Sequence, residues 1–244
     1  LFESKEEGSD METLADALQA RSCAYRLLAF FMALPTRDVA DSVLAGSLRA
    51  DVEEIADGAN FDPEEARRVT EALDAENSFW QLDAEEALRA LRLDYTMLFT
   101  NPEGAVVSPY EACFKGSDDF DSSGLTFISP TALDAERVYR QLGIKPSGHS
   151  NESADHMGVE TEFLGLVYEQ LAGAVDDSGD EERQRLATIL EDFDRGHFLK
   201  WGAAFFSRVQ NAAQTPVYRA LGCLGVALAA SERDVFAGCL APCA

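Results

Sequence analysis

The chain has 244 residues, 46% of them hydrophobic, and it carries 44 Asp and Glu against 20 Lys and Arg, a formal net charge of −24. This apolar content excludes a disordered chain, and the length allows a core that needs no disulfide cross-links. The negative charge repels nucleic-acid phosphates and anionic lipids, so it argues against a nucleic-acid partner and leaves either simple solubility or attraction of a basic ligand. No apolar run approaches the roughly 20 residues of a membrane-spanning helix.

The N-terminal part predicts one long helix. Residues 1–10 are expected to be a flexible segment, added or processed, ahead of an all-helical domain over 11–244. From residue 11 onward, apolar side chains recur at steps of three, four or seven: Met11, Leu14, Leu18, Tyr25, Leu28 and Met32. This stripe predicts a helix of about twenty residues that ends before Pro35.

Further helix starts are marked by caps and prolines. In "FDPEEARRVTEAL" (61–73), Asp62 is a candidate N-cap, Pro63 fits the first helical position, and Glu65 can complete a capping box. The pairs Ser129-Pro130 and Thr215-Pro216 repeat the cap-then-proline pattern.

Helical stripes also cover residues 83–99, 159–172 and 186–209, the last with a bend expected at Gly196. No segment alternates apolar and polar residues as a strand would. The fold class predicted is therefore all-α, a single globular bundle of about ten helices.

Residues 101–129 interrupt the helices, because Pro, Gly, Ser and Asp occur there without a helical stripe. A connection of this length is typically functional or linking. We therefore predict a long loop or hinge between two helical halves, about 11–100 and 130–244. Residues 143–153 and the acidic run 176–182 are expected to be shorter loops.

The five cysteines include no Cys-x-x-Cys pair. An odd number in a chain of this size argues against a disulfide framework and a structural zinc site, and it predicts reduced thiols in a cytoplasmic protein. The sequence also lacks a glycine-rich phosphate loop and a Gly-x-Ser-x-Gly nucleophile motif. Of the three histidines, His149 is expected in a solvated loop and His197 on a partly buried helix face.

The third histidine forms the group Asp155, His156 and Glu160, for which two interpretations remain open. As metal ligands they would suggest a metal-dependent, HD-like phosphohydrolase, although such a site needs further histidines on neighbouring helices. Alternatively, Asp155 lies in the first turn of a helix that begins near Ser153, and His156 bonds locally in a polar knot.

Three stretches together carry a resemblance: "DYTMLFTNP" (94–102), "SPYEACF" (108–114) and "ADHMGVETEFLGLVYE" (154–169). In this order they resemble the TorD/DmsD/NarJ family of redox-enzyme maturation chaperones. "VYRQLGI" (138–144) and the closing helices, with Trp201 and Tyr218, extend the resemblance over about residues 10–230. The chain departs from the family where Ala112-Cys113 stands in place of the usual Ser and where Glu162 precedes Phe163.

The resemblance implies a non-catalytic cytoplasmic chaperone without a cofactor or metal. Its partner would be the catalytic subunit of a molybdenum-cofactor oxidoreductase of the DMSO-reductase type, bound through its basic twin-arginine leader or another segment before export. The protein itself would be a monomer or a domain-swapped homodimer. Weak guanine-nucleotide binding, also raised by the family, has no phosphate loop to support it.

A leader with two arginines and an apolar stretch calls for carboxylates beside an aromatic–aliphatic groove. Carried over by position, the expected leader-binding residues are Tyr95, Leu98, Phe99, Pro109, Tyr110, Glu111, Asp155, His156 and Glu160.

Overall fold

The computed structural model describes residues 3–74, 78–114, 129–145, 151–177 and 180–240. In these ranges the chain forms eleven α-helices and no named strand. The helices are α1 (Glu3–Phe31), α2 (Arg37–Leu44), α3 (Ser47–Gly58), α4 (Pro63–Asp74), α5 (Ala84–Tyr95), α6 (Glu111–Phe114), α7 (Pro130–Gln141), α8 (Met157–Asp177), α9 (Asp180–Gly196), α10 (Phe198–Ala212) and α11 (Pro216–Leu240). A 3₁₀ turn (Ser78–Gln81) precedes α5 and a π-helical turn (Thr96–Thr100) follows it. The predicted all-α fold class is confirmed.

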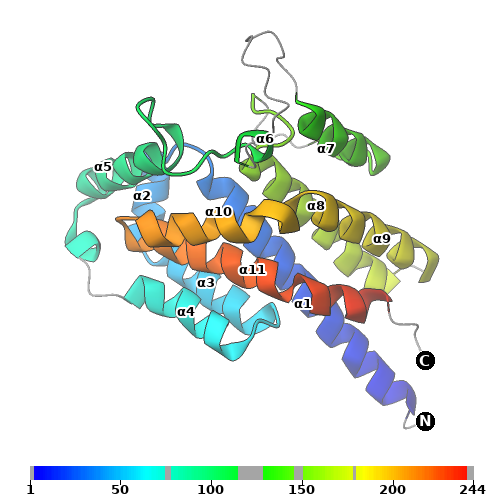
Figure 1. Ribbon diagram of the computed structural model, residues 1–244. Coiled ribbons are helices and arrows are strands. Elements are labelled where there is room, and N and C mark those ends of the chain that lie inside the picture. Colours follow the sequence, from blue (N-terminus) through cyan, green and yellow to red (C-terminus); the bar gives the residue numbers. More distant parts are fainter. Residues whose placement is uncertain (1–2, 75–77, 115–128, 146–150, 178–179, 241–244) are drawn as a thin grey trace.

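The bundle is built around two packed helix pairs. The long helix α1 packs along α8, and α10 packs along α11, whose other side contacts α4. Figure 1 shows α10 and α11 lying side by side across the front of the bundle, with α1 running behind them. None of the described helices is both long enough and apolar enough to cross a membrane.

The predicted helix boundaries have identifiable caps. Ser129 accepts a hydrogen bond from the Ala132 amide at 3.0 Å, and Thr215 accepts one from the Tyr218 amide at 3.3 Å. The expected bend at Gly196 is a break, since α9 ends there and α10 begins at Phe198.

Three expectations are changed. Asp62 accepts from the Glu64 amide at 2.9 Å, but Glu65 pairs with Arg68 at 3.0 Å and not with the Asp62 amide. The capping box lies one helix later, between Asp83 and Glu86. Helix α1 already begins at Glu3, and helices α8 and α9 extend into the acidic run, leaving 178–179 outside the described residues.

A buried polar cluster joins α1, α8, α9 and α11. The carboxylate of Glu232 accepts hydrogen bonds from the Arg21 guanidinium and from the hydroxyls of Tyr25 and Tyr168. Asp194 of α9 lies beside this group, and burial, together with the charge of Glu232, raises its pKa well above the ordinary value. Glu232 is thus paired with Arg21, and the environment of Asp194 favours its protonated form.

Substituting the buried acid should change how stability depends on pH. The pKa of Asp194 is higher in the folded protein than its value near 3.8 in the unfolded chain. Its contribution to folding stability is therefore fully present below pH 3.8 and is lost as the pH rises through the folded-state pKa. Asp194→Asn cannot ionise. The difference between its free energy of unfolding and that of the wild type should therefore shift in favour of the variant as the pH increases, by at most about 1.4 kcal/mol per pH unit. Urea unfolding between about pH 4 and about pH 8 measures this gain. Asp192→Asn, an exposed acid on the same helix, should show no comparable gain.

Close helix packing depends on glycines. A Cβ on Gly222 would lie 2.5 Å from the backbone nitrogen of Gln210, so α11 can approach α10 here only without a side chain. The exposed Gly173 of α8 has no atom within 4 Å of the same position.

These two glycines predict opposite effects of the same substitution. Gly222→Ala should lower the free energy of unfolding by about 1–3 kcal/mol, because the backbone of α10 must move. Gly173→Ala should raise it by about 0.5–1 kcal/mol through helix propensity. Thermal and urea unfolding of both variants test the pair, and equal effects at the two positions would contradict this packing.

Candidate functional site

The second and third stretches of the resemblance meet through their main chains. The Glu111 amide donates to the Asp155 carbonyl at 2.8 Å, and the Met157 amide donates to the Pro109 carbonyl at 2.7 Å. Between them, Tyr110 and His156 form an isolated antiparallel β-bridge, and their rings contact edge to face. The long linker is thus attached to the start of α8, and it contains the short helix α6; residues 115–128 lie outside the described part of the chain.

Asp155 does not lie in the first turn of a helix, contrary to the expectation, because α8 begins only at Met157. Asp155 lies in a turn before the bridge, in which the His156 amide donates to the Ser153 carbonyl at 3.0 Å. The buried Asp155 carboxylate instead accepts from the Ala112 amide at 3.3 Å and from the Ser129 hydroxyl at 3.2 Å. It therefore ties the starts of α6 and α7 to the start of α8.

His156 bonds locally, as the second interpretation proposed. Its Nδ1 accepts from the Gly158 amide at 3.0 Å. The phosphohydrolase alternative finds no support, since neither Asp155 nor His156 belongs to a group of potential metal ligands among the described residues.

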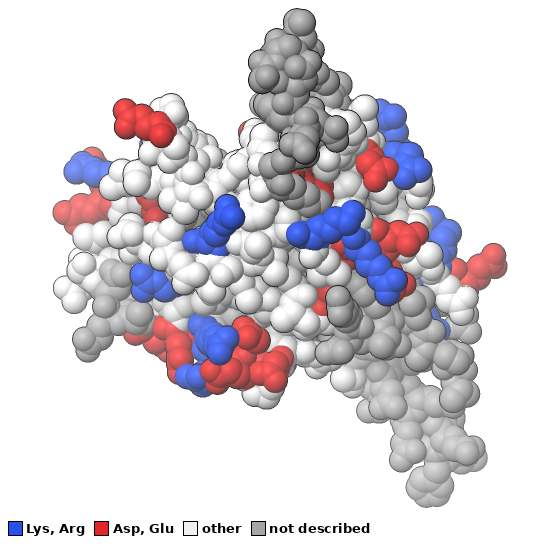
Figure 2. Space-filling view, in the orientation of Figure 1, with Lys and Arg blue, Asp and Glu red and all other residues white. Residues whose placement is uncertain are grey.

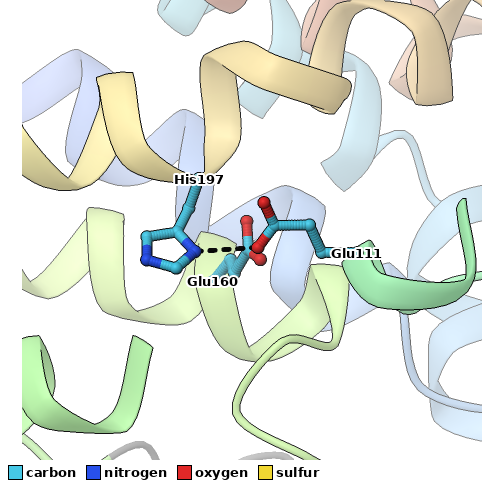
Figure 3. A group of neighbouring side chains, drawn as sticks. All are labelled: Glu111, Glu160 and His197. Carbon is cyan, nitrogen blue, oxygen red and sulfur yellow. Dashed lines mark hydrogen bonds and ion pairs between the residues drawn. The ribbon is translucent and has the colours of Figure 1, made fainter. Parts of the chain in front are cut away.

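A different set of three ionisable side chains converges behind this junction: Glu111 of α6, Glu160 of α8 and His197 before α10. Figure 3 shows the three side chains pointing toward one another from three separate elements. His197 Nδ1 lies 2.8 Å from Glu111 Oε2, and Trp201 Nε1 donates to Glu160 Oε2 at 3.1 Å. All three residues are buried. Burial, reinforced by the charge of Glu111, raises the pKa of Glu160 well above its ordinary value.

His197 was not predicted to take part in a site. The sequence places it 37 residues after Glu160 and 86 after Glu111, in a helical stripe, so no local spacing signals the group. Only the break between α9 and α10, indicated by Gly196, hinted that this histidine occupies a special position.

The expected leader-binding residues lie together but are mostly inaccessible. Tyr95 and Tyr110 are partly exposed, whereas the others are buried: Leu98, Phe99, Pro109, Glu111, Asp155, His156 and Glu160. The Tyr110 hydroxyl donates to the exposed Glu152 at 2.6 Å. Burial, followed by the hydrogen bond to Glu152, raises the pKa of Tyr110.

An open groove lies elsewhere, between α1, α2 and α3, with a volume of about 920 Å³. Its floor is apolar and includes Leu27, Phe30 and Val39, with Phe30 57% exposed. A smaller compartment of about 400 Å³ continues it past Leu34 to Pro35 at the end of α1. Sequence reasoning missed this groove, although positions 23, 27 and 30 form a second stripe on α1 beside the core-facing one, and Leu34 follows shortly after the helix ends.

Acidic side chains surround this groove. Asp16, Asp38, Asp51 and Glu54 line it and are exposed, while the lining Arg26 pairs with Glu169 at 3.3 Å. The acids of α4 are arranged differently, because Arg67 bonds both Glu64 and Glu71. Figure 2 shows such mixed red and blue clusters over α4. The groove rim is therefore a net negative surface beside exposed apolar side chains.

Comparison with known proteins shows the family to which the chain belongs. The family described as "Nitrate reductase delta subunit" matches residues 61–207, more than half of the chain. A chaperone protein TorD from Photobacterium profundum is 30% identical over 121 residues, which cover 50% of this chain and 52% of the relative. The chain thus spans about half the length of the curated relative it matches. It belongs to the nitrate reductase delta subunit family, and its resemblance to the TorD/DmsD/NarJ chaperones is confirmed.

Asp155 should prove structural. Asp155→Ala removes a buried acceptor that serves both the Ala112 amide and the Ser129 hydroxyl, so it should lower the free energy of unfolding by about 1–3 kcal/mol. Hydrogen exchange at the Ala112 amide should accelerate along with it. Glu152→Ala, which removes a nearby exposed acid, serves as control and should change stability by less than about 0.5 kcal/mol. An Asp155→Ala protein as stable as the wild type would contradict this role.

Proposed function

We propose that the protein is a non-catalytic cytoplasmic chaperone for a molybdenum-cofactor oxidoreductase. It binds the basic twin-arginine leader, or another basic amphipathic segment, of the client's catalytic subunit and holds the client until its cofactor is inserted. The observation that carries this proposal is the acid-rimmed apolar groove on α1, in a member of this family.

The chemistry of the groove matches such a segment. Exposed carboxylates can accept bidentate hydrogen bonds from adjacent guanidinium groups, and an aromatic–aliphatic floor can bind the apolar residues that follow. Asp51 and Glu54, three residues apart on α3, lie on the same helix face toward the groove. The net charge of −24 would speed encounter with a basic segment at low salt.

Tyr95 and Tyr110 remain proposed as contacts at the far end of the surface. The Tyr95 hydroxyl donates to the Met32 carbonyl at 3.3 Å, next to Ala33 of the smaller compartment. The buried residues of the expected set, such as Asp155, support this surface from behind. The protein acts as a monomer or as a domain-swapped homodimer, with the linker 101–129 as the hinge.

The proposal predicts how binding responds to charge. Calorimetric titration with twin-arginine leader peptides should give binding to one leader, and the Arg-Arg→Gln-Gln peptide should bind at least about tenfold more weakly. The double variant Asp51→Asn/Glu54→Gln should bind the leader about five- to tenfold more weakly than the wild type. Phe30→Ala should weaken binding by a similar factor, because each of these contacts is at a partly exposed surface. Glu64→Gln/Glu71→Gln on α4, which removes the same number of charges, should bind like the wild type.

The possible outcomes separate the alternatives. If the α3 and Phe30 variants bind normally but Tyr110→Ala does not, the ligand lies at the tyrosine end and not in the groove. If no leader binds while the catalytic subunit of a non-exported reductase is captured directly, the client segment is not a twin-arginine leader. Absence of both interactions would overturn the chaperone proposal.

A further inference from the structure

The three converging side chains form a geometry suited to a metal ion. One ligand atom each from Glu111, Glu160 and His197 lies within 4.8 Å of the others. Ligands at about 2.0–2.2 Å from one zinc ion lie about 3–3.5 Å apart, so side-chain shifts of about 1 Å would bring all three into range. The three residues come from elements far apart in sequence, and Figure 3 shows their functional groups meeting at one point.

Outer groups orient these potential ligands. His197 directs Nδ1 into the group, and its other ring nitrogen, Nε2, lies 3.5 Å from the Asp134 carboxylate of α7. A carboxylate on the far nitrogen is the usual arrangement of a metal-binding histidine. Trp201 similarly fixes Glu160 through Oε2, and this leaves Oε1 available to a ligand.

An independent observation points to a ligand at this position. Glu160 is fully buried, yet its Oε1 makes no hydrogen bond to any described atom. Such an oxygen is costly in a protein interior unless something satisfies it. Two carboxylates and one imidazole are an N/O donor set that suits zinc and similar divalent transition metals, and the two negative charges balance a divalent ion.

We propose that Glu111, Glu160 and His197 bind a divalent transition-metal ion that fastens α6 to α8 and α10. The bound ion leaves at least one coordination position for water or another donor. The ion fastens the described part of the linker, residues 101–114, to the bundle, so its expected effect is on the stability of the protein. This site is separate from the groove on α1 and does not depend on the proposed chaperone role.

One substitution separates metal binding from folding at this site. Burial, together with the charge of Glu111, raises the pKa of Glu160 above its ordinary value. Glu160→Gln keeps the shape of this side chain without a negative charge, so the variant should fold like the metal-free wild type. It nevertheless lacks the carboxylate that a metal requires.

Titration of the chelator-treated full chain with Co²⁺, followed by its visible absorption, tests the proposal. The wild type should bind a single equivalent with the bands of a nitrogen–oxygen site, and X-ray absorption of the zinc form should show no sulfur ligand. Glu160→Gln and His197→Gln should bind at least about 100-fold more weakly, and the outer-group variant Asp134→Asn about tenfold. The control Asp192→Asn, which removes an exposed acid of α9, should match the wild type.

Thermal unfolding with increasing Zn²⁺ provides a second readout. The midpoint should rise with metal concentration for the wild type and stay constant for Glu160→Gln. The proposal is overturned if the wild type binds no metal, if Glu160→Gln retains wild-type affinity, or if sulfur ligands show that the ion sits on cysteines.

Discussion

The described fold depends on how a strongly acidic chain neutralises acids in its interior. Six carboxyl groups are buried among the described residues: Asp94, Glu111, Asp155, Glu160, Asp194 and Glu232. A buried carboxylate without a partner is far too costly to survive, so each must find a cation, hydrogen-bond donors or a proton. The partners belong mostly to distant parts of the chain. Satisfying these acids therefore determines which helices meet.

The hydrogen bonds and the ion pair of each buried acid hold particular helices together. Glu232 brings α1 and α8 to α11 through Arg21, Tyr25 and Tyr168. Asp94 of α5 accepts from the amide and hydroxyl of Thr215, so it caps α11 from a different helix. Buried ion pairs add little net stability compared with apolar side chains, but losing one partner is costly. The apolar core thus supplies most of the stability, and the buried acids specify the arrangement of the helices.

The sequence predicts what depends on local patterns. Apolar spacing and cap-then-proline pairs indicate the all-α class and several helix starts, because these depend on neighbours within a few residues. The predicted position of Asp155 in a helix was wrong, because the main-chain bridge between Tyr110 and His156 joins segments 46 residues apart. The group around His197 was missed for the same reason. The groove was missed because only the core-facing stripe of α1 was interpreted, and the second stripe beside it was overlooked.

Helix α1 has one face toward the interior of the bundle and another toward the open groove. Arg21 and Tyr25 face the buried acids, whereas Leu27 and Phe30 face the open groove. The described acids inside accept hydrogen bonds, pair with a cation as Glu232 does with Arg21, or have a raised pKa as Glu160 and Asp194 do. The acids at the groove rim stay in water, where ionisation costs little and their field reaches an approaching cation. The same excess of carboxylates therefore organises the bundle where it is buried and attracts basic partners where it is exposed.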